Sequence, residues 1–188
     1  MWLGSIGGGV LAADTGRPMF ASHSLDFTDN DIPVTSVRAL FTDSERNIWM
    51  GIGTYGLACI EQATGKLKSH SQIPEFAGMS IPTVFSVVQR RNSGDIWFGT
   101  YDGGIFIYRK GRQVENLTAD NCEFVGNSCV SALYEDRQGN CWVGTRGSLG
   151  VLLADGQSFL FGPMTFADNT RLDWLYVRDI IADSENSV

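Results

Sequence analysis

The sequence predicts an all-β fold made of four-stranded antiparallel sheets, each a blade of the β-propeller type. Three observations predict it. A W-x-G motif recurs about every 47 residues, and a valine-led, strand-like segment recurs upstream of it with the same period. In addition, 22 glycines and 11% aromatic residues favour turns and strands over long helices. A period of about 45 to 50 residues with four short strands is the size of one propeller blade.

The first strand of each repeat, strand A, begins at a recurring valine. Hydrophobic residues follow three and four positions after each valine, a pattern that fits a strand buried on both faces. Polar segments such as SERN and RQGN come next and are typical of tight turns between hairpin strands. The four valines are Val37, Val84, Val130 and Val177.

The second strand, strand B, carries the W-x-G motif. A large side chain that recurs at one strand position in every repeat is expected to pack between neighbouring blades, so we interpret these residues as structural. The copies are Trp2 with Gly4, Trp49 with Gly51, Trp97 with Gly99, and Trp142 with Gly144. A second glycine recurs before strand C, at Gly9, Gly56, Gly104 and Gly150, and an outer strand D completes each unit.

These repeats predict a single domain over residues 1–188, with strands B, C and D of a first blade at its start and a lone strand A near Val177 at its end. Four blades is the low end of the propeller range, so we expect an open arc of a larger propeller; a closed four-bladed ring is the alternative. An arc leaves the blade faces around Trp2 and Trp142 unpacked. It is therefore expected to pack against remaining blades or to self-associate through its open edges.

A second interpretation of part of the repeat is a dinucleotide-binding loop. Gly51, Gly53 and Gly56 have the G-x-G-x-x-G spacing that cradles a pyrophosphate. Such a loop must open a helix, but the following LACIEQATGKLK has no amphipathic stripe long enough for one. Gly53 also has no counterpart in the other repeats, so we interpret the spacing as a coincidence and predict no cofactor.

Composition and charge exclude several kinds of partner. The 188 residues are 43% hydrophobic and can bury a core. A net charge of −7 and a pI near 4.7 argue against nucleic acid and anionic membranes, which both require basic patches. No run of eighteen apolar residues and no signal-peptide pattern occurs, so no membrane segment is expected within the chain.

The segments VSALYEDRQGNCWVGTRGSLG and VRALFTDSERNIWMGIGTYGL resemble the two-component regulator propeller repeat. The resemblance implies a non-catalytic sensor module of a hybrid two-component protein, located in the periplasm or otherwise outside the cytoplasm, whose propeller detects oligosaccharides and signals to a histidine kinase elsewhere in the parent protein. Two positions depart from the pattern: Ile52 replaces the usual Thr, and Arg90 lies where other copies have Asp.

Candidate ligand-binding residues come from the face where the repeats diverge. In a propeller the B–C and D–A loops share one face, and these loops carry aromatic, acidic and basic side chains that suit a neutral polyol such as a sugar. The candidates are Tyr55, Tyr101, Asp102, Arg146 and Trp174, with Glu75, Asp120 and Asp168 in the D–A loops. Ordinary variable loops without a ligand are the alternative.

Catalysis and metal binding have little support in the sequence. No nucleophile elbow or Cys–His pair stands out, so we predict no catalytic residues; a polysaccharide lyase or hydrolase on a propeller is the alternative function. His23 and His70 share one repeat position without recurring Cys or carboxylate partners, and no metal site is predicted. The aspartates of the A–B turns are interpreted as turn-fixing residues rather than calcium ligands.

The four cysteines divide into two groups. Cys122 and Cys129 flank EFVGNS before a strand A, close enough to form a loop disulfide in an oxidising compartment. Cys59 and Cys141 belong to non-neighbouring blades and are interpreted as small buried residues.

The arc and the ring differ in their association state. An arc should self-associate through its unpacked blade faces, so size-exclusion chromatography with light scattering should give a mass above that of one chain. A monomer that melts cooperatively and stays monomeric on dilution would instead identify a closed ring.

Overall fold

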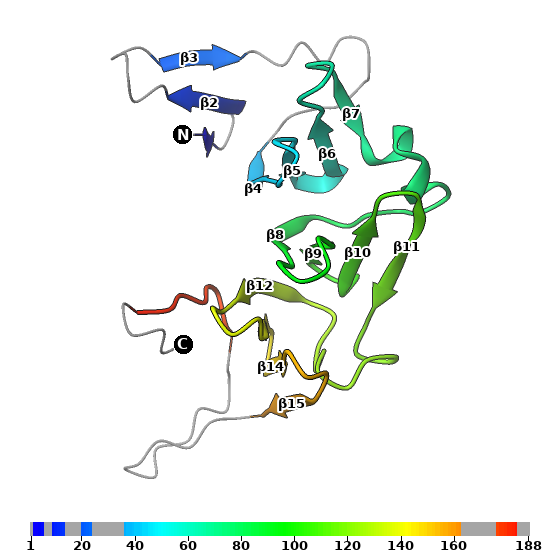
Figure 1. Ribbon diagram of the computed structural model, residues 1–188, viewed down its shortest axis with the longest axis vertical. Coiled ribbons are helices and arrows are strands. Elements are labelled where there is room, and N and C mark those ends of the chain that lie inside the picture. Colours follow the sequence, from blue (N-terminus) through cyan, green and yellow to red (C-terminus); the bar gives the residue numbers. More distant parts are fainter. Residues whose placement is uncertain (1, 6–8, 14–19, 24–35, 163–175, 184–188) are drawn as a thin grey trace. The chain divides into compact units, whose positions relative to one another are not determined.

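The computed structural model describes residues 2–5, 9–13, 20–23, 36–162 and 176–183 (Figure 1). They form two compact units, Met1–Val84 and Phe85–Val188. Within the described residues the regular structure is almost entirely antiparallel strands, and the helices are three short 3-10 turns. The all-β prediction with propeller-type blades is therefore confirmed, whereas the single partial propeller over 1–188 stays a prediction.

The first unit contains one three-stranded and one four-stranded sheet. The three-stranded sheet has the order β1-β2-β3, as expected for strands B, C and D of a first blade. The four-stranded sheet has the order β4-β5-β6-β7, and β1 lies beside β4. The strands are β1 (Trp2–Ser5), β2 (Gly9–Ala13), β3 (Phe20–His23), β4 (Val37–Thr42), β5 (Ile48–Ile52), β6 (Gly56–Ile60) and β7 (Leu67–Ser69). The 3-10 turns are η2 (Gly53–Tyr55), η3 (His70–Gln72) and η4 (Pro74–Phe76).

The second unit contains two complete blades. Each is a meander in which sequential strands pair, so strands A to D run in order across the sheet. One blade consists of β8 (Val84–Gln89), β9 (Ile96–Thr100), β10 (Ile105–Arg109) and β11 (Arg112–Leu117). The other consists of β12 (Val130–Glu135), β13 (Cys141–Thr145), β14 (Leu149–Leu152) and β15 (Ser158–Phe161). Strand β12 lies beside β9 of the preceding blade.

The prediction of a fourth strand A at Val177 is wrong for the described residues. Tyr176 forms an isolated bridge with Arg146, but residues 177–183 have no strand structure. The other three A segments each pair with a strand B that follows them, as β12 pairs with β13. Within the described part of the chain, no following strand B pairs with residues 177–183. Their backbone therefore forms no β-sheet hydrogen bonds of the kind that the other A segments make.

The G-x-G-x-x-G spacing does not form a cofactor loop. Gly51 lies inside β5, residues 53–55 form the turn η2, and Gly56 begins β6. The glycines thus belong to a hairpin connection between paired strands, and no helix N-terminus is available to a phosphate.

Strand B is the most buried strand of each complete blade. In β5 and β9 all five residues are buried, and Trp49 and Trp97 are 2% and 5% exposed. In the second unit Trp97 stacks on Phe124, with 6.3 Å between ring centroids. The tryptophans at these two positions therefore lie in the interior, as packing residues must.

The glycine of each W-x-G motif lies against the valine that opens the next A segment. A Cβ placed on Gly51 would lie 3.0 Å from the Cβ of Val84, and one on Gly99 would lie 2.8 Å from Cγ1 of Val130. The same relation joins Gly144 and Val177, where a Cβ would lie 2.5 Å from Cγ1. Only a residue without a side chain allows this approach.

The A–B turn is held by the recurring aspartate. Asp136 accepts hydrogen bonds from the backbone N–H of Gln138 (3.0 Å) and Asn140 (2.9 Å), and from the side chains of Asn140 (2.8 Å) and Trp142 (3.0 Å). Asp43 does the same for the backbone and side chain of Asn47 and for the indole of Trp49. The aspartate is thus saturated with donors from its own blade, which is the turn-fixing arrangement.

These hydrogen bonds lower the pKa of the Asp136 carboxyl. Burial alone would raise the pKa of this carboxyl, but the donors of Trp142, Asn140 and Gln138 outweigh burial and hold the pKa below its usual range. A lowered pKa in the folded state means that the carboxylate stabilises the fold above its unfolded pKa and loses this contribution as the pH falls.

We predict that Gly99→Ala lowers the free energy of unfolding by roughly 1 to 3 kcal/mol, because the new methyl group would lie 2.5 Å from the Ser86 hydroxyl and 2.8 Å from Cγ1 of Val130. Gly162→Ala is the control, since a Cβ there meets nothing within 4 Å. Urea denaturation checks both, and equal losses at the two glycines would contradict the contact.

We predict that Asp136→Ala costs about 2 to 4 kcal/mol near neutral pH, since it leaves the half-buried indole of Trp142 and the amide donors of Asn140 and Gln138 without an acceptor. The difference from wild type should shrink as the pH falls below the usual aspartate pKa of about 4 and through the lowered pKa of Asp136 in the folded state, where the native carboxylate also becomes protonated. Asp155→Ala is the matched control, because Asp155 caps an exposed turn through Gln157. Thermal melts between neutral and acidic pH would refute the prediction if the difference did not depend on pH.

Candidate functional site

The B–C turns of the second unit are fixed by buried threonines. The hydroxyl of Thr100 donates to Gly104 O (2.9 Å) and accepts from Gly103 N (3.0 Å). The hydroxyl of Thr145 donates to Ser148 O (3.0 Å). In the first unit Ile52 replaces this Thr, and the connection is the 3-10 turn η2, where Thr83 donates its hydroxyl hydrogen to Gly53 O (2.5 Å). The threonine departure thus corresponds to a different turn.

Each B–C turn of the second unit is bonded to the chain that enters the next A segment. Gly104 N donates to Ser128 O (2.8 Å), and Arg146 N donates to Cys129 O (3.1 Å). Val177 N in turn donates to Thr145 O (3.3 Å). These bonds bring the turn after β9, the turn after β13 and the segment around Tyr176 to one region.

Tyr101 and Asp102 form the tip of the turn after β9. Tyr101 is 46% exposed, and its ring meets Phe85 edge to face, with 5.8 Å between centroids. Asp102 is exposed beside it. The tip therefore exposes the Tyr101 ring, which packs against Phe85, with the Asp102 carboxylate next to it.

Arg146 and Tyr176 contribute the other side of this region. Arg146 is exposed and bridges Tyr176 through the backbone. The guanidinium of Arg178 lies over the Tyr176 ring, 4.2 Å from its centroid, in a cation–π contact. The Tyr176 hydroxyl lies 4.0 Å from the Cys129 sulfur.

The environment of Tyr176 raises the pKa of its hydroxyl. Burial raises the pKa of the Tyr176 hydroxyl, Cys129 adds to the rise, and Arg178 opposes it. Tyr101 adds to the rise as the last of its causes. At neutral pH the Tyr176 hydroxyl therefore stays protonated and can both donate and accept hydrogen bonds.

We refer to this set of residues as the loop cluster: Phe85, Tyr101, Asp102, Arg146, Tyr176 and Arg178. Of the candidate residues named from the sequence, the structure brings Tyr101, Asp102 and Arg146 together. Tyr55 belongs to the first unit, where it is half-buried against a core of Val37, Ile48, Met50, Ile52 and Ala58. Trp174 lies outside the described residues.

Three members of the loop cluster were missed from the sequence: Phe85, Tyr176 and Arg178. A signal for them exists in the repeat columns on either side of the recurring valine. The preceding column reads Ser36, Thr83, Cys129 and Tyr176, and the following column reads Arg38, Phe85, Ser131 and Arg178. These columns vary while the valine does not, as expected where a loop enters strand A at its start.

All four cysteines are free thiols in the structure. Cys122 and Cys129 are both free in the structure, so the loop disulfide is not formed in it. Cys59 and Cys141 are buried, and burial raises the pKa of each thiol to about 12. Thiols with such pKa values are unreactive near neutral pH, in keeping with a packing role.

The loop cluster combines aromatic rings with hydroxyl, guanidinium and carboxylate groups. Exposed aromatic faces stack on the apolar face of a sugar, and phenols, guanidinium groups and a carboxylate bond its hydroxyls. Among the described residues no group of three or more His, Cys, Asp or Glu side chains is arranged to hold a metal ion. No helix in that part of the chain is long and apolar enough to cross a membrane.

Comparison with known proteins finds one matching family model and several solved structures with a similar fold. Residues 125–147 match the family described as Two component regulator propeller. A search of curated proteins finds no match to the sequence. An extracellular domain of BT4673 from B. thetaiotaomicron, described as a hybrid two component system, superposes with a TM-score of 0.73 at 21% identity over 98% of this chain and 24% of that one.

Two further structures share the fold. The extracellular domain of BT3049 from B. thetaiotaomicron, also described as a hybrid two component system, gives a TM-score of 0.64 at 18% identity over 100% of this chain and 27% of that one. PorZ of Porphyromonas gingivalis, a surface component of the type-IX secretion system, gives 0.59 at 18% identity over 97% of this chain and 28% of that one. The chain spans about a quarter of the length of these proteins. Residues 125–147 thus match the two component regulator propeller repeat, and the fold of the chain is similar to that of these extracellular domains.

Proposed function

We propose that this chain is a non-catalytic ligand-sensing module of a two-component signal transduction system, located outside the cytoplasm. The observation that carries the proposal is its fold similarity, over nearly its whole length, to extracellular domains described as hybrid two component systems. The parent protein would then contain a histidine kinase, and the remaining blades of the propeller would be the chain's direct partners.

We further propose that the ligand is an oligosaccharide bound at the loop cluster. Tyr101, Tyr176 and Arg146 come from three different loops, and hydrogen bonds between these loops hold them in place. Such a preformed surface loses little conformational entropy on binding, which favours ligand recognition. The net charge of −7 gives no support to nucleic acid or an anionic membrane as the ligand.

The test is calorimetric titration of the chain with a panel of soluble oligosaccharides. For a saccharide that binds, Tyr101→Ala should weaken affinity about 3- to 10-fold, because an aromatic contact contributes roughly 0.5 to 1.5 kcal/mol beyond its buried area. Phe159→Ala is the matched control, since Phe159 is an equally exposed ring, 47%, on strand β15.

Two results would contradict the proposal. Equal losses for Tyr101→Ala and Phe159→Ala would place the ligand away from the loop cluster. Release of shortened or unsaturated sugar products during the titration would identify a hydrolase or lyase instead of a sensor.

A further inference from the structure

One A–B turn in the second unit departs from the aspartate-centred pattern. Arg90 N donates to Asp95 O (2.8 Å), the same backbone bond that joins Asp43 to Asn47 and Asp136 to Asn140 (3.0 Å each). Arg90 therefore occupies the aspartate position of the repeat. The indole Nε1 of Trp97, which an aspartate would satisfy, has no hydrogen-bond partner.

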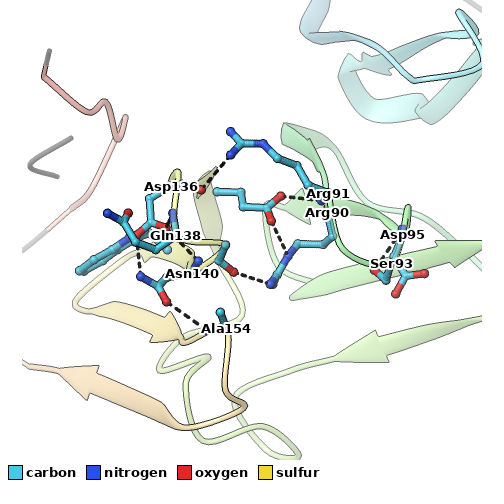
Figure 2. Close-up of polar contacts among 11 residues, drawn as sticks. Arg90, Arg91, Ser93, Asp95, Asp136, Gln138, Asn140 and Ala154 are labelled. Carbon is cyan, nitrogen blue, oxygen red and sulfur yellow. Dashed lines mark hydrogen bonds and ion pairs between the residues drawn. The ribbon is translucent and has the colours of Figure 1, made fainter. Parts of the chain in front are cut away.

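Arg90 uses its side chain to reach the neighbouring blade of the same unit (Figure 2). Its guanidinium lies over the Trp97 ring, 5.0 Å from the centroid, and its Nη2 donates to Gly139 O (2.9 Å) in the next A–B turn. Arg91 also reaches this turn, since its Nη1 donates to Asp136 O (3.2 Å). The positive residues of one turn thus bind the turn of the next blade.

The counter-charge is Glu135, at the end of β12. Arg90 Nε lies 3.7 Å from Glu135 Oε1, and the two side chains are only 5% and 3% exposed. The other carboxylate oxygen accepts from Arg91 N (2.9 Å). Neither Arg90 Nε nor Glu135 Oε1 has a hydrogen-bond partner, so each buried charge is compensated mainly by the other.

Neither partner recurs in the other repeats. The aspartate position reads Asp43, Arg90, Asp136 and Asp183, and the position before it reads Thr42, Gln89, Glu135 and Ala182. The Gly–Val contact between successive segments is the same in three places, so it cannot distinguish one neighbour from another. The charged residues can distinguish one neighbouring repeat from another, because a neutral residue opposite Arg90 would leave the buried charge of Arg90 unpaired.

We propose that Arg90 and Glu135 form a junction-specific pair that determines which repeat packs on the blade β8–β11. Swapping and misassembly between similar units are the characteristic errors of repeat proteins. A buried pair that only one neighbour satisfies acts against them, as a polar residue fixes register in a coiled coil. This role is independent of ligand binding at the loop cluster.

The first part of the test is a double-mutant cycle in the full chain. Glu135→Gln and Arg90→Met should each lower the Tm by about 6 to 15 °C, because each leaves one buried charge uncompensated. The double variant R90M/E135Q should recover most of the loss, since Met still covers Trp97 and Gln still accepts from Arg91. Lys68→Met with Glu61→Gln is the control, an ion pair within one blade whose side chains are 35% and 33% exposed; it should change the Tm by less than about 2 °C.

The second part measures assembly rather than stability. After denaturation and dilution, R90M/E135Q should yield at least about twofold less native-size product than wild type, with the remainder in swapped oligomers, despite its restored Tm. The proposal is overturned by additive losses in the cycle, by single variants as stable as wild type, or by a double variant that reassembles as completely as wild type.

Discussion

The packing of successive blades depends on one contact, between the glycine of W-x-G and the valine that opens the next A segment. At Gly51, Gly99 and Gly144 a methyl group would collide with Val84, Val130 and Val177. The missing side chain lets two strands of successive repeats approach each other closely. This approach buries the flanking Trp49 and Trp97, so the position of the large residue depends on the absence of a side chain two residues later.

Burying an indole creates a polar requirement, because its N–H loses water and needs an acceptor. Asp43 and Asp136 supply that acceptor and use the same carboxylate to close the A–B turn. The third repeat solves the problem differently. Arg90 and Phe124 both lie against the Trp97 ring, while its N–H remains unpaired. Stacking on Phe124 and the cation–π contact with Arg90 replace the hydrogen bond that an aspartate would accept from Trp97. The Arg90 side chain also donates to the next blade, at Gly139 O.

The sequence was sufficient for the blade order because the repeat is read from periodicity, and periodicity reflects burial that every blade shares. It predicted the three strands that open the chain and the meander order of the complete sheets. It was not sufficient at Val177, because a strand needs a partner, and a strand-like pattern does not show whether one is present.

The candidate site was predicted in part for a related reason. Tyr101, Asp102 and Arg146 stand in turns that visibly interrupt the repeat, so they were found. Phe85 and Tyr176 flank the core valines and were hidden among strand residues; only the contacts between loops show that they join the same region. Arg90 was noticed as a departure, but its partner Glu135 lies in another repeat at no fixed spacing, and only the fold brings the two together.

The Gly–Val contact also bears on how the chain folds. Its partners are close in sequence, 84 minus 51, 130 minus 99 and 177 minus 144, which gives separations of 33, 31 and 33 residues. Loop-closure entropy rises only slowly with such lengths, and every junction closes a loop of similar size. Folding of this chain is therefore expected to propagate from blade to neighbouring blade, as in other repeat architectures. During synthesis, the valine that contacts the glycine of a strand B emerges about thirty residues after that strand, so each junction can begin to form soon after its blade is made.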